Sequence, residues 1–482
     1  MIIKHFLPFE GEMTCSVRSS LVNDSKILIN TLTDNHIKVV GAKSKKLLAA
    51  YMESYAAKLQ RNRRMSMLLC QMGWKLANNK EIFVLGKKIY HRDGSVDNAS
   101  LAKNVPRSAE GFRSRGSLDK WVTATEVLNR PGMEPFAFAL LAGGFGAPLM
   151  KFTGFDGAMV SLVGKTGAGK TLILRWIQSV WGYHNDLMML RDDTKNALVS
   201  RLGVYGNLPL TVDEVTNTTG MELSDLVYRV TQGRDKARLT KNSEEKKLIN
   251  KWNTLAVTSS NASLVDKLAS AKHDASAEIN RVFEYFIHEH PEFSGKVTTN
   301  LYWTLDKNYG VAGEVYAKWL VQNIETIENS LRKIKEKIDL DSDMQGDERF
   351  WSAVMAVAIF GGLVAKKLGL IRFDINRVLK WATDTAIGMR YNKREYAGDP
   401  IDTLGQFIDE QAANRLVVTD AGRGKRNAQI LEEPRGPLIL RFEVDKSRLY
   451  FSRTFIRKWL DKKFGSYHSV KNSLMECGIL VS

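Results

Sequence analysis

The sequence predicts an α/β protein whose central domain is built on a parallel sheet. Residues 121–290 alternate apolar strand-like runs with helical patterns, as strands joined by crossover helices do. Residues 164–171 form a glycine-rich loop between such a strand and a helix. From Val311 to Leu368 the pattern is almost wholly helical, so a helical domain is expected after the sheet.

A mixed α+β domain is expected before this core. Strand-like runs at Ile27–Leu32, Ile37–Val40 and Ile82–Leu85 accompany a helical stretch from Lys45 to Leu69. The polar segment Asn104–Asp119 is typical of a linker. The expected domains are an N-terminal α+β domain, the α/β core, the helical domain and a C-terminal domain, at residues 1–120, 121–300, 301–395 and 396–482.

The C-terminal domain has a pattern of its own. Leu438–Val444 and Arg448–Phe451 alternate as a strand pair, and two helical runs, Phe455–Lys463 and Ser469–Cys477, follow them. Residues 411–482 hold 14 Lys or Arg against 7 Asp or Glu. Strand pair, helix, tight turn and helix in this order predict a basic, winged-helix-like domain.

The whole chain is basic, with 70 Lys and Arg against 53 Asp and Glu and a formal net charge of +17. Excess positive charge favours polyanionic partners, because binding releases the counterions of their phosphates. Nucleic acid is the partner that we expect first. A membrane surface or an acidic protein is the alternative.

The spacing of the cysteines and the length of the apolar segments favour a reducing, cytoplasmic compartment. Cys15, Cys70 and Cys477 are far apart and lack zinc-site or disulfide spacing, as expected in a reducing environment. The N-terminal residues lack the apolar stretch of a signal peptide. Phe136–Met150 and Trp351–Ala365 are apolar but shorter than a bilayer span, so core helices are expected. We therefore expect a cytoplasmic protein with no membrane partner.

The glycine-rich loop matches the phosphate-binding pattern G-x-x-x-x-G-K-[ST] in full. In such a loop, glycines let backbone N–H groups turn toward the β-phosphate, and the helix N-terminus adds partial positive charge. Lys170 is placed to reach the β- and γ-phosphates and Thr171 to ligate Mg²⁺, so ATP and Mg²⁺ are the expected cofactors. The predicted nucleotide-binding residues of the loop are Gly164, Lys165, Thr166, Gly167, Ala168, Gly169, Lys170 and Thr171.

A second apolar strand, Leu208–Val212, ends in Asp213 and Glu214. Ligands of open α/β sheets bind at the carboxyl ends of the strands. Asp213 is therefore expected to hold the metal through water, and Glu214 to orient and deprotonate the attacking water. The alternative is an ordinary strand end with two exposed acids, but the phosphate-binding loop upstream favours catalysis.

Two further polar residues flank the next strands. Asn261 ends the strand run Thr254–Ser260, where its amide could hydrogen-bond the γ-phosphate or the attacking water; the alternative is a strand cap. Arg281 precedes a new strand, where ring ATPases place an arginine finger that acts on the neighbouring subunit's nucleotide. The alternative for Arg281 is a salt-bridged surface arginine.

The order of these motifs resembles that of the AAA+ ATPases, especially the superfamily 3 helicases. The chain is more closely similar to the phage and plasmid family that carries "domain of unknown function 927", over most of residues 60–390. The residues that carry this resemblance are Gly73-Trp74, Phe83-Val84-Leu85, Gly116, Trp121, the loop 164–171, Val180-Trp181-Gly182, Thr194, Asn196, Asp213-Glu214, Gln232-Gly233, Lys236, Arg238, Asn308-Tyr309-Gly310 and Arg349-Phe350.

The resemblance implies an ATP-dependent DNA helicase or translocase of phage or plasmid replication, in the cytoplasm of a bacterial host. Such a protein is expected to form a homo-oligomeric ring, most simply a hexamer, on single-stranded or forked DNA, with a primase or polymerase as candidate partner. No primase motif is recognisable in the N-terminal residues. Arg349 opens the helical domain, where a second sensor arginine contacts the nucleotide in cis; a helix cap or a structural arginine is the alternative.

The segment between the second and third core strands separates the candidate functions. Superfamily 3 helicases place a pore hairpin there with basic residues on DNA, which implies DNA contacts for Lys236, Arg238 and Lys241. Protein-remodelling ATPases use an aromatic pore loop, and this segment has none. An AAA+ ATPase that remodels or loads a protein partner, or a DNA packaging or partition motor, is the alternative to the helicase. A solvated basic loop is the alternative for the three side chains.

Overall fold

The computed structural model divides the chain into two compact units, described here one at a time. One comprises residues 1–70 and 97–105, and the other comprises residues 71–96 and 106–482. The described residues are 2–9, 11–17, 25–39, 41–62, 68–102, 105–190, 192–235, 251–271, 275–293, 295–344, 346–396, 400–419, 429–464, 467–476 and 478–480.

The first unit is a small α+β body. Its elements are the antiparallel pair β1 (Ile2–Leu7) and β2 (Gly11–Ser16), the helices α2 (Ser25–Thr33) and α3 (Ala42–Asn62), and the parallel pair β3 (Leu68–Leu69) and β8 (Ser100–Leu101). The expected strand at Ile27–Leu32 is a helix instead. Leu28 and Leu32 are four residues apart and both fully or almost fully buried, which is helical spacing. Residues 37–39 belong to neither a helix nor a strand. The helix α3 confirms the helical stretch from Lys45 to Asn62, whereas Leu68 and Leu69 at its expected end form the strand β3 instead.

The structure divides the expected N-terminal domain. Strands β4 (Gly73–Ala77), β5 (Lys80–Leu85) and β6 (Lys88–His91) form an antiparallel meander that belongs to the second unit, and β7 (Val96–Asn98) follows. The Trp74 indole N–H donates to the Pro148 carbonyl at 2.9 Å, and Phe83 lies 6.0 Å from Trp181 between ring centroids. These buried aromatic contacts join the meander to the core, so residue 120 is not the boundary of a compact unit.

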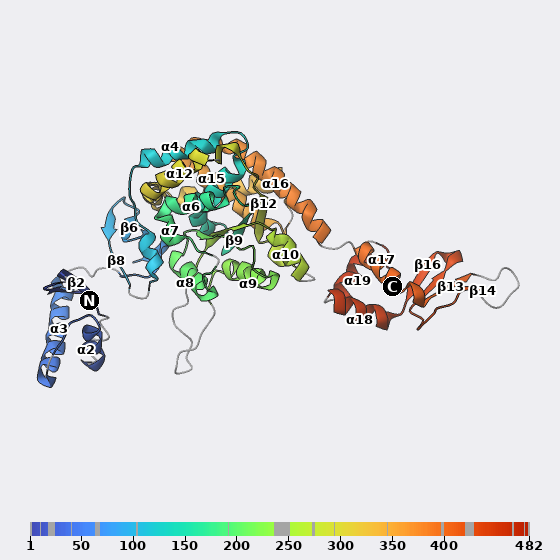
Figure 1. The fold of residues 1–482 in the computed structure, drawn as a ribbon, viewed down its shortest axis with the longest axis horizontal. Coiled ribbons are helices and arrows are strands. Elements are labelled where there is room, and N and C mark those ends of the chain that lie inside the picture. The colour runs from blue at the N-terminus through green and yellow to red at the C-terminus, as the bar shows by residue number, and fades with distance from the viewer. Residues whose placement is uncertain are drawn as a thin grey trace. The chain divides into compact units, whose positions relative to one another are not determined.

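The core of the second unit is a four-stranded parallel sheet. Its strand order is β10 (Leu210–Val212), β11 (Thr254–Ser260), β9 (Gly157–Val163) and β12 (Val282–Phe286). Every residue of β9, β10 and β11 is buried, as expected for a parallel sheet covered by helices (Figure 1). Because the strands are parallel, the segments that follow β9, β10 and β11 meet at one edge of the sheet. The predicted α/β core is therefore present.

Helices surround this sheet, and they include two apolar segments long enough to cross a membrane by length and composition alone. These are Glu134–Phe152 and Arg349–Lys367, whose most apolar windows are 83% and 78% buried, as in core helices. The helical elements of the core are η1 (Arg107–Gly111), α4 (Leu118–Thr125), η2 (Glu126–Asn129), α5 (Glu134–Ala139), the π-helical η3 (Leu140–Gly146), η4 (Ala147–Phe152), α6 (Lys170–Trp181), α7 (His184–Leu187), α8 (Lys195–Tyr205), α9 (Gly220–Thr231), α10 (Leu264–Ala271), α11 (Ser276–Ile279), η5 (Pro291–Phe293) and α12 (Gly295–Lys307).

The region after the sheet is helical, as expected. It contains α13 (Val311–Gln322), α14 (Ile324–Asp341), α15 (Arg349–Lys367) and α16 (Ile375–Tyr396). Residues 342–344 and 346–348 lie between α14 and α15. α15 is almost entirely buried and packs on η3, where a Cβ on Gly361 would lie 2.9 Å from the Phe145 backbone. Glycine permits this close helix approach.

The C-terminal region begins with α17 (Pro400–Glu410) and η6 (Ala412–Asn414). A mixed sheet follows, of order β14 (Gln429–Glu432), β13 (Arg415–Thr419), β15 (Leu440–Glu443) and β16 (Arg448–Phe451), with η7 (Val444–Lys446) between the last two strands. α18 (Arg453–Phe464) and α19 (Tyr467–Glu476) complete it. The expected strand pair and two helices are present in order; their winged-helix character remains a prediction.

Candidate nucleotide-binding site

The glycine-rich loop connects β9 to α6 at the carboxyl edge of the sheet. Gly167 and Gly169 both have φ of +91°, a left-handed conformation that glycine adopts without steric cost. The Gly164 N–H donates to the Ser260 carbonyl at 3.1 Å, and a Cβ on Gly164 would lie 2.3 Å from the Ile287 carbonyl oxygen. Neighbouring strands thus hold the start of the loop, while its tip has the backbone geometry of a phosphate-binding turn ahead of a helix N-terminus.

Lys170 is the first residue of α6 and points back across this loop. Its Nζ donates to the carbonyl oxygens of Gly164 and Lys165, both at 2.7 Å, and to Asn261 Oδ1 at 3.1 Å. Burial lowers the pKa of the Lys170 ammonium, and the nearby carboxylates of Asp213 and Glu214 oppose that shift. The ammonium therefore lies where the loop, the third core strand and the two acids converge.

Thr171 and the acids that follow β10 form a connected hydrogen-bond network. The Thr171 hydroxyl donates to Asp213 Oδ2 at 2.9 Å. The Ser259 hydroxyl donates to Asp213 Oδ1 at 2.5 Å and accepts from the Glu214 backbone N–H at 3.0 Å. Glu214 is exposed and has φ of +60°, an uncommon conformation for a residue with a side chain. Its backbone is therefore fixed by Ser259 while its carboxylate faces solvent.

Asn261 is held in place by the segments beside it. Its backbone N–H donates to the Thr216 hydroxyl at 2.9 Å. The following helix α10 begins on a buried carboxylate, because Glu284 accepts from the Leu264 N–H at 2.8 Å and from the Ser263 hydroxyl. Burial raises the pKa of Glu284, although these hydrogen bonds oppose the shift. The Asn261 amide is thus presented to Lys170 from a fixed turn.

The chemistry of these side chains fits a hard cation. A hydroxyl oxygen and a carboxylate oxygen are the ligands that Mg²⁺ prefers, and Thr171 and Asp213 supply one each next to the loop. Among the described residues no cluster of three or more His, Cys, Asp and Glu side chains forms a separate metal site. The structure thus brings Lys170, Thr171, Asp213 and Asn261 together by direct contacts, with Glu214 beside them.

The structure places the two predicted arginines at the opposite edge of the sheet. Arg281 immediately precedes β12, whose first residue pairs with Met159 and whose last pairs with Val163. The five residues of β12 span about 17 Å at 3.3 Å per residue, which separates Arg281 from the loop of its own chain. Arg281 is therefore positioned away from its own nucleotide site.

Arg349 lies at the same edge as Arg281. Its guanidinium carbon is 5.8 Å from the ring centroid of Phe155, which precedes β9. The loop 164–171 follows the other end of β9, so Arg349 does not contact it in cis. The helical domain packs on the core at the amino edge of the sheet, where the ring centroids of Phe155 and Phe350 are 4.5 Å apart. The length of β9 therefore separates Arg349 from the loop.

The predicted DNA-binding residues Lys236, Arg238 and Lys241 lie outside the described residues. The two sides of their segment are described, however. Arg234 and Lys251 form an antiparallel β-bridge, and the Trp252 backbone N–H donates to the Gly233 carbonyl at 2.8 Å. The described residues on the two sides of this segment are therefore paired with each other.

A strand, a left-handed glycine turn and a helix, with acid and amide side chains on the adjoining strands, define the P-loop class of nucleotide-binding folds. Residues 12–250 match the family described as "Domain of unknown function (DUF927)". None of the curated protein sequences compared with the chain matches it.

The fold is similar to that of a solved helicase. The structure titled "SCCmec type IV Cch - active helicase" matches with a TM-score of 0.70 and 17% identity, covering 100% of this chain and 87% of that one. A JCV helicase bound to a thiazolopyridine-containing acetamide matches with a TM-score of 0.28 and 11% identity, covering 51% of this chain and 66% of that one. The likeness of fold therefore rests on the first structure.

Proposed function

We propose that this chain is an ATP-driven DNA helicase or translocase that works as a ring, in phage or plasmid replication. The observation that supports it best is the convergence of Lys170, Thr171, Asp213 and Asn261 at one edge of the parallel sheet. The similarity of fold to a helicase and the net charge of +17 favour DNA as the substrate of the motor.

Each side chain has a defined task in hydrolysis. Lys170 supplies positive charge to the β- and γ-phosphates, and Glu214 takes a proton from the attacking water. Thr171 and Asp213 would hold Mg²⁺, which when bound neutralises phosphate charge and orients the phosphates. Asn261 contacts Lys170 and is placed to register whether the γ-phosphate is present.

Assembly is part of this proposal. Arg281 is separated from its own loop by the length of β12, so it can serve catalysis only at the site of a neighbouring copy. A trans arginine of this kind stabilises the charge that develops on the transferred phosphoryl group. This argument favours a ring, for which a hexamer is the simplest form.

The alternative is an ATPase that remodels or loads a protein partner. It predicts ATP hydrolysis that DNA does not stimulate and no strand displacement. The decisive experiment measures ATP-dependent displacement on forked DNA with 3′ or 5′ tails, together with the native mass of the protein. Displacement by a closed oligomer supports the helicase, whereas hydrolysis without displacement on either fork rejects it.

A further inference from the structure

Aromatic rings from two elements set the direction of the Arg281 side chain. Its guanidinium carbon lies 5.2 Å from the ring centroid of Tyr228 on α9 and 5.2 Å from that of Phe350 on α15. Its Nη1 also donates to the Ala277 carbonyl. A guanidinium held against two ring faces loses the rotational freedom of a long side chain. The direction of Arg281 therefore depends on where Phe350 is held.

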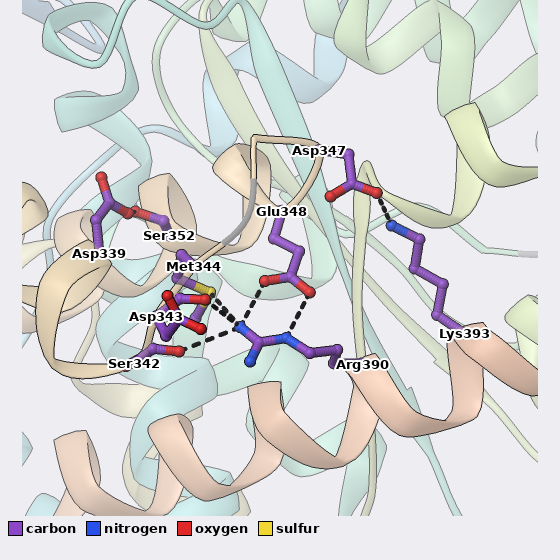
Figure 2. A network of polar contacts seen from close by, with 9 residues as sticks. All are labelled: Asp339, Ser342, Asp343, Met344, Asp347, Glu348, Ser352, Arg390 and Lys393. Carbon is purple, nitrogen blue, oxygen red and sulfur yellow. Dashed lines mark hydrogen bonds and ion pairs between the residues drawn. The ribbon is translucent and has the colours of Figure 1, made fainter. Parts of the chain in front are cut away.

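An ion pair fixes the loop of residues 342–344 and 346–348, which precedes Phe350, as Figure 2 shows. Arg390 of α16 donates from Nε to Glu348 Oε1 at 2.7 Å and from Nη2 to Oε2 at 2.6 Å. The same Nη2 donates to the carbonyl oxygens of Ser342 and Asp343. The Glu348 side chain is 2% exposed and that of Arg390 16% exposed. Two parallel hydrogen bonds shielded from water define one orientation of the loop.

A second ion pair from the same helix holds the loop residue before Glu348. Lys393, which like Arg390 projects from α16 toward the loop, pairs with Asp347 (Figure 2). Asp347 is the chain neighbour of Glu348 and lies three residues before Phe350, so this pair fixes the same part of the loop. Partial burial would raise the pKa of Asp347, but the hydrogen bond and charge of Lys393 outweigh it, with a smaller contribution from Asn280, and the pKa is lowered.

We propose that α16 positions Arg281 for action on the nucleotide of a neighbouring subunit. The ion pairs Lys393–Asp347 and Arg390–Glu348 both fix the loop ahead of Phe350, and the Phe350 ring lies against the Arg281 guanidinium. The positioning residues are Lys393, Asp347, Arg390, Glu348 and Phe350. This inference rests on the proposed function, because it requires ATP hydrolysis and a trans role for Arg281.

The competing explanation is that these ion pairs only stabilise the packing of α14, α15 and α16. The two explanations differ in where a defect appears. Loss of packing lowers the stability of the subunit that carries the variant. The resulting loss of activity then does not depend on which face of that subunit meets a neighbouring subunit. Loss of positioning leaves that subunit's own nucleotide pocket intact and impairs only the pocket of its neighbour.

The test variant is Lys393→Met, because methionine keeps an apolar side chain of similar length without the charge. We expect kcat for ATP hydrolysis to fall about tenfold, as small displacements of a catalytic group do, with KM for ATP within about twofold of wild type. Lys393→Arg keeps the charge and should restore most of kcat. The matched control is Lys380→Met, an exposed lysine on the same helix, which should leave kcat unchanged.

Mixed rings then show whether the defect of Lys393→Met lies on the subunit face that carries Arg281. Lys393→Met subunits mixed with Glu214→Gln subunits should exceed the average activity of the two separate preparations, because intact arginines then face intact pockets. The same Lys393→Met subunits mixed with Arg281→Ala subunits should show no gain, since both variants impair the same face. Gain in the second mixture, or a wild-type kcat for Lys393→Met, would overturn the proposal.

The controls separate this proposal from the proposed function. Wild-type protein that hydrolyses no ATP would reject both. Wild-type hydrolysis with no gain in an Arg281→Ala and Glu214→Gln mixture, when native mass shows mixed rings, would reject the trans role of Arg281 and with it the positioning path. A gain in that mixture, with no gain from Lys393→Met and Glu214→Gln, rejects the positioning path alone.

Discussion

The Thr171 hydroxyl donates a 2.9 Å hydrogen bond to Asp213 Oδ2 and so joins the start of α6 to the end of β10. Both oxygens suit Mg²⁺, and the pair forms only because β9 and β10 are parallel strands of one sheet. This contact links the two motifs that define the candidate site.

Thr171→Val should raise the Mg²⁺ concentration needed for half-maximal ATP hydrolysis, because it removes a hydroxyl ligand while keeping the shape of the side chain. Thr171→Ser keeps the hydroxyl and should behave nearly as wild type. A Mg²⁺ titration of steady-state hydrolysis at saturating ATP measures both. Equal Mg²⁺ requirements for Thr171→Val and wild type would remove Thr171 from the metal site.

Lys170→Ala should weaken nucleotide binding. The Lys170 ammonium is the positive charge nearest the loop carbonyls, and it is buried with two acids close by. Without it the carboxylates of Asp213 and Glu214 would repel the phosphates. Titration with a fluorescent ATP analogue should show the loss, and circular dichroism should show an unchanged fold. Wild-type affinity in Lys170→Ala would contradict the assignment of the loop.

Glu214→Gln should bind ATP but hydrolyse it slowly, because an amide cannot accept a proton from the attacking water. Losing one positioned base costs about 10²–10⁴-fold in rate. The exposed carboxylate of Glu214 is near Lys170 without contributing to the core, so stability should change little. Single-turnover hydrolysis at saturating ATP isolates this step. Turnover at the wild-type rate would exclude Glu214 as the base.

The main parts of the site were predictable from the sequence, but their connections were not. A glycine-rich loop between strand and helix, and polar residues after apolar strands, give Lys170, Asp213 and Asn261 directly, since parallel strands end at one edge. Ser259 was missed, although it bonds both Asp213 and Glu214, because its role depends on the register of β11 beside β10. The run Ser259-Ser260-Asn261 at a strand end was the available signal.

The arginines and the domain boundary illustrate what local patterns leave open. Arg349 was expected near the nucleotide, but its place depends on how the helical domain packs, and Phe155 and Phe350 bring it to the other edge. The meander that carries Trp74 was predicted to belong to the N-terminal domain. Sequence order alone does not show that the Trp74 side chain packs on η4 of the core.

His184 should make stability depend on pH. It is fully buried at the start of α7, with Nε2 3.0 Å from Asp306 Oδ1. Burial lowers the pKa of His184 to about 4, against the opposing charge of Asp306. Below the ordinary histidine pKa of about 6.5, His184 is protonated in the unfolded chain but stays neutral in the folded chain until the pH approaches 4. The free energy of unfolding therefore falls as the pH drops through this range.

Urea unfolding followed by tryptophan fluorescence between pH 7 and pH 5 would measure this dependence. Each unit of pKa difference corresponds to about 1.4 kcal/mol, so the histidine term over this range is on the order of 2 kcal/mol. His184→Gln cannot titrate and should show a shallower loss of stability than wild type. Parallel pH profiles for the two proteins would mean that His184 titrates alike in the folded and unfolded chain.

Neutralising Lys236 and Arg238 together should uncouple ATP hydrolysis from DNA. The two residues are separated by one position, so on a hairpin strand their side chains point to the same face, and copies in a ring would line a pore with positive charge. Phosphate contacts of this kind need charge but no base-edge geometry, so binding should be salt-sensitive and largely independent of sequence. Basal ATP hydrolysis should remain near wild type, because neither residue belongs to the phosphate-binding motif of residues 164–171 or to the acids that follow β10. Stimulation of hydrolysis by DNA and strand displacement should be lost, and the slope of log affinity against log salt should become flatter. A double variant that unwinds forked DNA at the wild-type rate would instead indicate a solvated loop and move the DNA contact to the basic C-terminal region.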